Sequence, residues 1–157
     1  MIDKIEQWID RTLKEYDHLK VSCAVLLPEF QAFFGAEVLE NSYFVVVDSI
    51  PKPDFDELTG AGYDEFLNMK PAGITYKNTY FIQRGFENRF ALHFHELVHV
   101  LQWQLLGAFG FIQRYLDEIA EYGYDKAPLE VMAYELDSYF SAGLPVKSIP
   151  DYVSKHL

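Results

Sequence analysis

Residues 90–103 read FALHFHELVHVLQW, and His95, Glu96 and His99 within them form an HExxH pattern. On a helix, residues four apart lie on the same face, so His95 and His99 can hold one metal ion while Glu96, about 100° round, stands beside it. Neutral imidazole nitrogens are typical zinc ligands, and a neighbouring carboxylate can take a proton from a water molecule at the metal. The stretch therefore predicts a buried helix that carries a zinc site, with Glu96 as the general base.

The residues around the motif support a helix from about 88 to 107. Asn88 offers an N-cap, Gly107 marks an end, and apolar residues recur between them at Leu92, Phe94, Leu97, Val98, Leu101 and Leu105. The alternative is a core helix whose histidines only form hydrogen bonds with their neighbours. Two ionisable rings on a buried face are costly without a partner, which favours the metal.

Composition narrows the class of protein. With 157 residues, of which 50% are hydrophobic, the chain suits a single domain with a sizeable core. A net charge of -11 argues against nucleic acid and anionic membranes as partners. Cys23 is the only cysteine, so neither a disulfide framework nor a thiolate zinc site is expected. The N-terminus has no signal-peptide pattern and no apolar run reaches about 20 residues, so we expect a soluble, cytoplasmic protein. The oligomeric state is not indicated.

The first half of the chain mixes helical and extended patterns. Apolar spacing predicts an amphipathic helix over residues 2–19. A short apolar run over 21–27 predicts a strand, followed by a helix over 29–39, although one helical hairpin is the alternative. The β-branched and aromatic run 43–50 predicts a buried strand. Residues 51–73 predict a loop with a short helix that could overhang a cleft.

The second half is predicted to surround the motif helix. Residues 74–76 and 79–83 indicate a hairpin, and the strand that comes just before a metal-binding helix could offer its open edge to an extended peptide. Amphipathic helices are expected over 111–122 and 129–142. The tail, 146–157, is expected to dock on the rest of the chain.

A metal with two histidine ligands needs a third protein ligand. The extended pattern HExxHxxGxxH is not met, because Gln102 and Leu105 stand where its Gly and third His would be. His93 lies about 160° round the helix from His95, which points it away from the metal and predicts a structural role. The other two histidines, His18 and His156, lie near the termini and are expected to be exposed.

Glu130 is the preferred third ligand. It lies on one face of a predicted helix with Tyr134 and Asp137, among apolar residues. A glutamate from a second helix that crosses the motif helix would complete a His, His, Glu set with one position open for water, which is the catalytic form of a zinc site. The alternative is that Glu130 only caps its own helix near Pro128.

The motif HELVHVLQW, followed by a helix and then PLEVMAY, resembles the zincin-like metallopeptidases of the gluzincin type. The resemblance covers about residues 74–142. It implies that His95, His99 and Glu130 bind Zn²⁺ and that Glu96 polarises the water. It also implies an α+β, zincin-like fold over 1–157, with a small mixed or antiparallel sheet packed on the active-site helix and further C-terminal helices. The chain departs from the group in lacking the NExxSD pattern and a large helical second domain.

Supporting roles follow from the chemistry. Asp137 could fix the tautomer of a ligand histidine by accepting a hydrogen bond, or could form a surface salt bridge. A donor is needed for the oxyanion of the tetrahedral intermediate, and Tyr124, Tyr134 and Tyr122 are the nearby candidates. Gln102 is placed to line the site or to form a hydrogen bond with the next helix.

The leading functional hypothesis is a zinc metallopeptidase acting on a peptide or protein substrate, in which Glu96 deprotonates a zinc-bound water that attacks the amide carbonyl. A second hypothesis is a zincin-like metal-binding interaction module with little or no hydrolysis. A third is a helical core without metal. Histidine and carboxylate ligands accept several first-row metals, so the pattern does not by itself select zinc.

Overall fold

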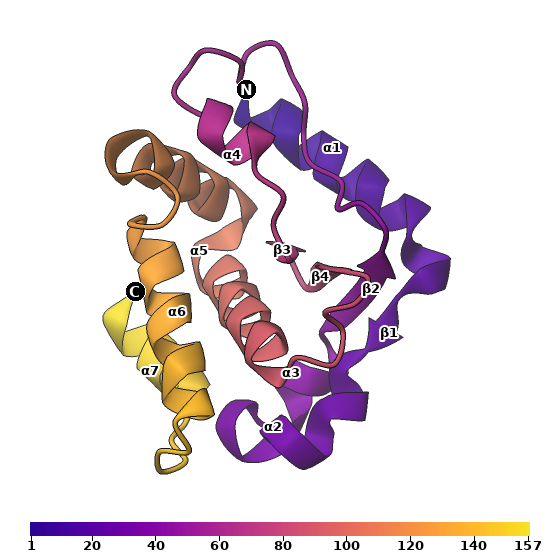
Figure 1. The fold of residues 1–157 in the computed structure, drawn as a ribbon, viewed down its shortest axis with the longest axis vertical. Helices are drawn as coiled ribbons and strands as arrows, with labels where there is room; N and C mark the ends of the chain where they lie inside the picture. The colour runs from indigo at the N-terminus through magenta and orange to yellow at the C-terminus, as the bar shows by residue number, and fades with distance from the viewer.

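Seven α-helices and two short 3-10 helices pack around a four-stranded sheet in the computed structural model, which describes all of residues 1–157 (Figure 1). The helices are α1 (Ile2–Glu15), α2 (Leu27–Phe34), α3 (Ala36–Glu40), α4 (Asp64–Asn68), α5 (Phe90–Tyr122), α6 (Pro128–Ser141) and α7 (Ile149–His156), with η1 (Asp17–Leu19) and η2 (Cys23–Leu26) between α1 and α2. The strands are β1 (Val21–Ser22), β2 (Tyr43–Val47), β3 (Gly73–Tyr76) and β4 (Thr79–Gln83). The expected mixed α+β class is confirmed. None of the helices combines the length and the apolar character that a membrane crossing requires.

The sheet has the strand order β1-β2-β4-β3, with β2 and β4 parallel and the other two pairs antiparallel. The hairpin of β3 and β4 is confirmed. β4, the strand that comes just before α5, is paired on both sides, so the expectation that it offers an open edge is wrong. That edge belongs to β3, because the pairing with β2 occupies the other side of β4.

The helix α5 consists of two segments separated at Gly107. Gly107 has φ 73° and ψ 165°, outside the helical region, which a glycine adopts without steric cost. We call residues 90–106 the motif segment and residues 108–122 the distal segment. They run at an angle to each other in Figure 1. The expected break at Gly107 is confirmed, but the Asn88 cap is wrong, because the helix begins one residue later, after Arg89, and no side chain caps it.

Three expectations for the N-terminal half change. The first helix stops at Glu15 rather than at residue 19. Only Val21 and Ser22 form a strand, because the Ser22 hydroxyl accepts a hydrogen bond from the amide of Ala24 and caps the 3-10 turn η2. The single helix expected over 29–39 is broken at Gly35, where φ is 84°.

Two buried clusters of apolar side chains lie on opposite faces of β4. Tyr80 and Ile82 belong to the cluster with α2, α6 and α7, whereas Phe81 belongs to the cluster with α1 and the distal segment. The C-terminal helix α7 buries Ile149 and Val153 in the first cluster, so the expected docking of the tail is confirmed. α5 contributes to both clusters, and its motif segment is therefore held from both sides.

Candidate metal centre

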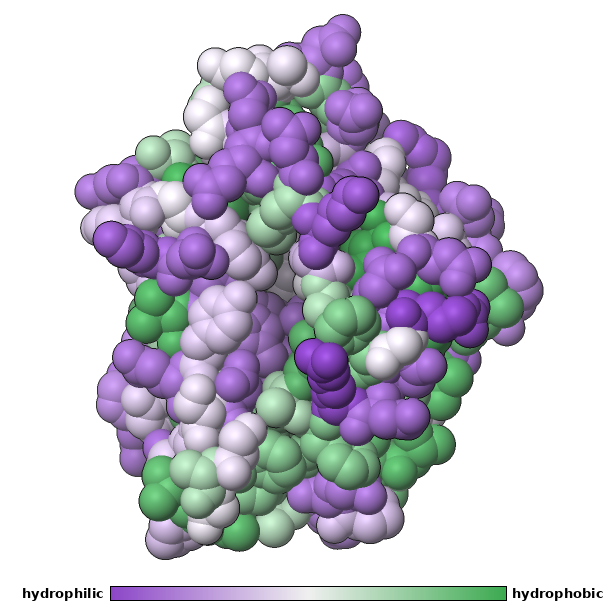
Figure 2. Space-filling view, in the orientation of Figure 1, coloured by the Kyte–Doolittle hydropathy of each residue, from purple (hydrophilic) through white to green (hydrophobic).

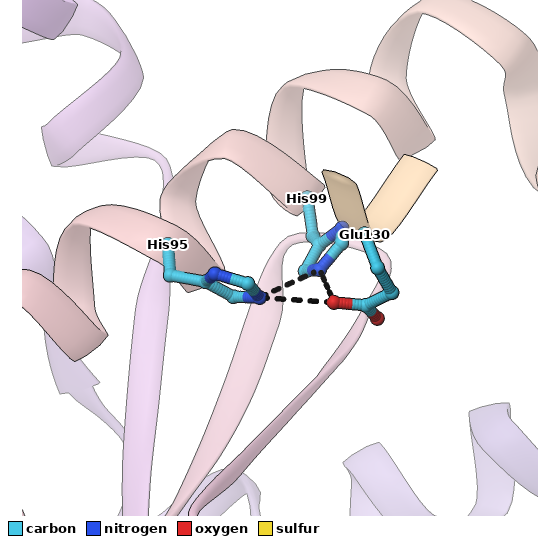
Figure 3. Close-up of side chains that lie close together, drawn as sticks. All are labelled: His95, His99 and Glu130. Atoms are coloured by element: carbon cyan, nitrogen blue, oxygen red, sulfur yellow. Dashed lines mark hydrogen bonds and ion pairs between the residues drawn. The ribbon is translucent and has the colours of Figure 1, made fainter. Parts of the chain in front are cut away.

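Helices α5 and α6 pack against each other and bring three predicted ligands together (Figure 3). The Nε2 atom of His95 lies 3.0 Å from Oε1 of Glu130, and the Nε2 atom of His99 lies 3.1 Å from the same oxygen. The two Nε2 atoms are 3.2 Å apart. All three side chains are buried. Glu130 therefore lies with the histidines and does not serve as the cap of its own helix.

The arrangement fits a divalent metal ion. A tetrahedral ion with bonds of about 2.0–2.1 Å separates its ligand atoms by roughly 3.3 Å. The three distances in the cluster, 3.0, 3.1 and 3.2 Å, are slightly shorter. The donor set combines two imidazole nitrogens with one carboxylate oxygen, which is a common set for first-row metals. The group can therefore hold a metal ion after a small outward movement of its side chains.

The other ring nitrogens of both histidines have hydrogen-bond partners that select their tautomers. Nδ1 of His95 lies 2.9 Å from Oδ2 of Asp137, and Nδ1 of His99 lies 2.7 Å from Oε1 of Gln102. The Gln102 amide is oriented by its NH₂ group, which donates to the carbonyl of Leu129 at 3.0 Å. Because both partners of the rings accept, Nδ1 carries the proton in the neutral form of each ring, and Nε2 is the nitrogen that can offer a lone pair to a metal ion. The expected hydrogen bonds, of Asp137 with His95 and of Gln102 with the next helix, are both present.

The electrostatics of the cluster favour positive charge. Burial disfavours the imidazolium form of His95, but hydrogen bonds to Asp137 and Glu130 outweigh burial and raise its pKa to about 10. Burial likewise opposes charge on His99, and the Glu130 carboxylate raises the pKa of that ring. Burial alone would raise the pKa of Glu130, yet the two imidazoles hold it well below its usual range. A buried carboxylate with this preference for cations suits a metal ligand.

Glu96 lies beside the cluster without entering it. Its Oε2 is 3.9 Å from Nε2 of His95, and its Oε1 accepts a hydrogen bond from the Thr75 hydroxyl at 2.9 Å. A Cβ atom at Gly73 would stand 3.1 Å from that carboxyl group, so only glycine fits there without displacing it. Burial raises the pKa of Glu96, although the two imidazoles counteract it. A carboxylate with a raised pKa is suited to proton transfer near neutral pH.

The site opens to solvent through a cleft between α6 and residues 65–73. The middle of this face is hollowed in Figure 2. The cleft has a volume of about 570 Å³, and its lining includes His95, Glu96, Tyr134 and Asp137. The predicted overhang of the 51–73 loop is confirmed, because Glu65, Met69 and Lys70 form one wall.

A second, smaller cavity of about 70 Å³ lies behind Glu96. His99, Glu130 and Glu96 contribute to its lining, together with mainly apolar residues of α1, the 51–73 region, β3 and both segments of α5. The cavity and the cleft have Gly73, Glu96 and Tyr124 in common. An apolar space therefore adjoins the polar site.

The three candidate oxyanion donors have different surroundings. Tyr134 lines the cleft with its ring centroid 4.5 Å from that of His95. Tyr124 lines both the cleft and the cavity, and burial raises its pKa, which keeps its hydroxyl group protonated. Tyr122 is 49% exposed and lines neither space. The geometry brings Tyr124 and Tyr134 to the site but not Tyr122.

Two site residues of the distal segment escaped the sequence analysis. The Tyr115 hydroxyl donates a hydrogen bond to Oε2 of Glu130 at 2.7 Å. A carboxylate oxygen of Glu118 accepts a hydrogen bond from the amide of Leu129 at 2.7 Å. The available signal was the position of Glu118 among apolar residues of an amphipathic helix, since a carboxylate there needs a partner.

The remaining histidines follow expectation. His93 points away from the cluster, with Nδ1 2.7 Å from the Tyr80 hydroxyl and Nε2 2.8 Å from the carbonyl of Glu87. Burial lowers the pKa of its ring. His18 and His156 are exposed.

Comparison with known proteins adds no relative: no protein-family model, curated protein or solved structure matches this chain.

Proposed function

We propose that the chain is a zinc-dependent metallopeptidase with a zincin-like fold. The observation that carries the proposal is the buried group of His95, His99 and Glu130, with ligand atoms 3.0–3.2 Å apart, beside the buried carboxyl group of Glu96. His95 and Glu96 line the open cleft, whereas His99 and Glu130 line the smaller cavity behind Glu96. His95, His99 and Glu130 would hold the ion. When bound, zinc supplies Lewis-acid chemistry that polarises an amide carbonyl and acidifies a water molecule.

The side chains around the ion have distinct roles in this proposal. Glu96 takes a proton from the attacking water and then passes it to the leaving amine, which its raised pKa favours. Thr75 orients the Glu96 carboxyl group through the 2.9 Å hydrogen bond. Tyr124 and Tyr134 are the hydroxyl donors placed to stabilise negative charge that develops on the substrate carbonyl oxygen.

The substrate in this proposal is a peptide in extended conformation. Gly73 of the edge strand β3 lies in the wall of the cleft, so an extended chain there can pair with an open sheet edge. The cavity of about 70 Å³ beside Glu96 suits an apolar side chain of that peptide.

A catalytic ion is preferred to a purely structural one for a geometric reason. A structural zinc site closes its fourth position with a protein ligand. Asp137 is the carboxylate of the cleft in direct contact with a ligand, and it bonds Nδ1 of His95, on the side of the ring opposite the ligand atom. Glu96 is held by Thr75 instead. The fourth position is thus available to water or substrate.

The test combines metal analysis with one substitution. Protein purified without chelator or a nickel column is expected to hold about one zinc ion per chain by plasma mass spectrometry. Glu96→Gln is expected to keep the metal and to lose roughly 100-fold to 10,000-fold of the hydrolysis of a peptide library, since it removes the general base. No metal after zinc is added back would refute the metal centre. Metal with no hydrolysis by the native protein would favour the interaction module.

A further inference from the structure

Glu130, the third ligand of the proposed metal centre, lies outside the HExxH motif. Glu130 lies 31 and 35 residues from the two histidines, so the motif cannot by itself place it. Its position depends on how α6 begins, and α6 begins at Pro128 with no side chain of its own as a cap. Another part of the chain must therefore orient this turn.

The backbone of Leu129, the residue before Glu130, is held at both of its polar groups. Its amide donates to Oε1 of Glu118 at 2.7 Å, and its carbonyl accepts from the Gln102 side chain at 3.0 Å. Leu129 is fully buried, so neither group has water as an alternative partner. Glu118 is itself buried, and its carboxylate is paired through Oε2 with Nε of Arg114 at 2.8 Å. These contacts fix the peptide units from which the Glu130 side chain projects.

The carboxylate of Glu130 is also held at its second oxygen. Oε1 faces the two imidazoles, whereas Oε2 accepts the hydrogen bond of Tyr115 at 2.7 Å. The hydrogen bond from the Tyr115 hydroxyl thus occupies Oε2 and leaves Oε1 available to the ion. Tyr115 and Glu118 lie three residues apart, on the same side of the distal segment, which Gly107 turns away from the motif segment.

We propose that Tyr115 and Glu118 are positioning residues that orient Glu130 for metal binding, Tyr115 through the side chain and Glu118 through the amide of Leu129. The inference rests on the proposed metal centre. Outer partners of metal ligands typically change affinity by about 10-fold to 100-fold. The distal segment is therefore part of the metal site, although none of its residues touches the ion.

The test measures zinc affinity of the full chain by competition with a chromogenic chelator. We expect Tyr115→Phe and Glu118→Ala each to weaken zinc binding by about tenfold or more. Glu118→Gln keeps a side-chain oxygen that can accept from Leu129, and it is expected to recover most of the loss. In the cobalt-loaded protein, Tyr115→Phe frees Oε2 to bind the ion and is expected to weaken the visible absorption typical of tetrahedral cobalt.

Two matched controls separate positioning from general stability. Tyr80→Phe removes another buried tyrosine hydroxyl, and Ser148→Ala removes the cap that accepts from Asp151 at the start of α7. Both are expected to lower stability and to leave zinc affinity unchanged within about twofold.

The possible outcomes are distinct. A native protein that binds metal, with Tyr115→Phe and Glu118→Ala binding it equally well, would overturn the inference and leave the proposed function standing. A native protein that binds no metal would overturn both. If Glu118→Ala does not fold, the affinity and cobalt spectrum of Tyr115→Phe decide the matter.

Discussion

Three buried histidines on one helix have two opposite environments. His93 faces a phenol and a backbone carbonyl, both neutral, and burial lowers the pKa of its ring. His95 and His99 are equally buried but face carboxylates, which raise the pKa of each ring despite burial. The difference shows that burial alone does not determine the role of a histidine. The partners of its two nitrogens do, because they decide whether the ring stays neutral in the core or carries charge beside carboxylates.

The largest expected effect comes from exchanging the two kinds of histidine for alanine. His99→Ala should weaken zinc binding roughly 100-fold to 1,000-fold, since about 10–16 kcal/mol is shared among four ligands of a typical site. His93→Ala, the matched control, should keep zinc affinity and lose about 2–4 kcal/mol of folding stability, because it opens a cavity and removes the hydrogen bond with the Tyr80 hydroxyl. Chelator competition and urea unfolding measure the two quantities. Equal loss of zinc affinity in both variants would contradict the prediction that His99 binds the metal and His93 does not.

The second prediction concerns pH. Without metal, His95 has a pKa of about 10 and stays protonated at neutral pH, so zinc must displace a proton. Apparent zinc affinity should therefore rise about tenfold per pH unit for each displaced proton as the pH increases from 6 to 9. Competition titrations at several pH values measure this slope. A zinc affinity that does not change with pH would contradict the prediction that zinc displaces a proton from His95.

The raised pKa of His95 also affects the folding stability of the metal-free protein, which should decrease as the pH rises. The folded-state pKa of His95 lies above the unfolded value of about 6.5, so its stabilising effect is complete below that pH and disappears as the pH rises to about 10. His93 has a lowered pKa, and its effect has the reverse sign: stability falls as the pH drops below about 6.5.

The smallest expected effect comes from a substitution beside His93, the histidine with neutral partners. Tyr80→Phe removes the hydroxyl that donates to Nδ1 of His93 and leaves that buried nitrogen without a partner. The expected cost is about 1–3 kcal/mol of folding stability, measured by urea unfolding. The hydroxyl lies outside the metal group, so a large change in zinc affinity would mean that His93 and the ligand histidines are coupled.

Sequence reasoning was most successful where function depends on local spacing. The HELVH helix and the orientation of His93 follow from a period of 3.6 residues, because side chains four apart must share a face. The break at Gly107 follows from the conformational freedom of glycine. The position of Glu130 beside the two histidines was only a preference over a role as a cap, since a helix pattern does not state which other helix it crosses. The strand over 21–27 failed because a single hydroxyl, that of Ser22, stabilises a turn instead.

By itself, the sequence determined that two imidazoles and one carboxylate lie on adjacent turns of a buried helix, which is a consequence of helix geometry. Only the tertiary structure decided that Glu130 lies beside them, that β3 rather than β4 forms the free edge of the hairpin, and that Tyr115 contacts Glu130 while Glu118 contacts the amide of Leu129. These contacts join residues far apart in the chain, and their geometry depends on how α5 bends at Gly107 and how α6 packs against it. No local periodicity carries that information, because it arises from the packing of whole elements around a shared core.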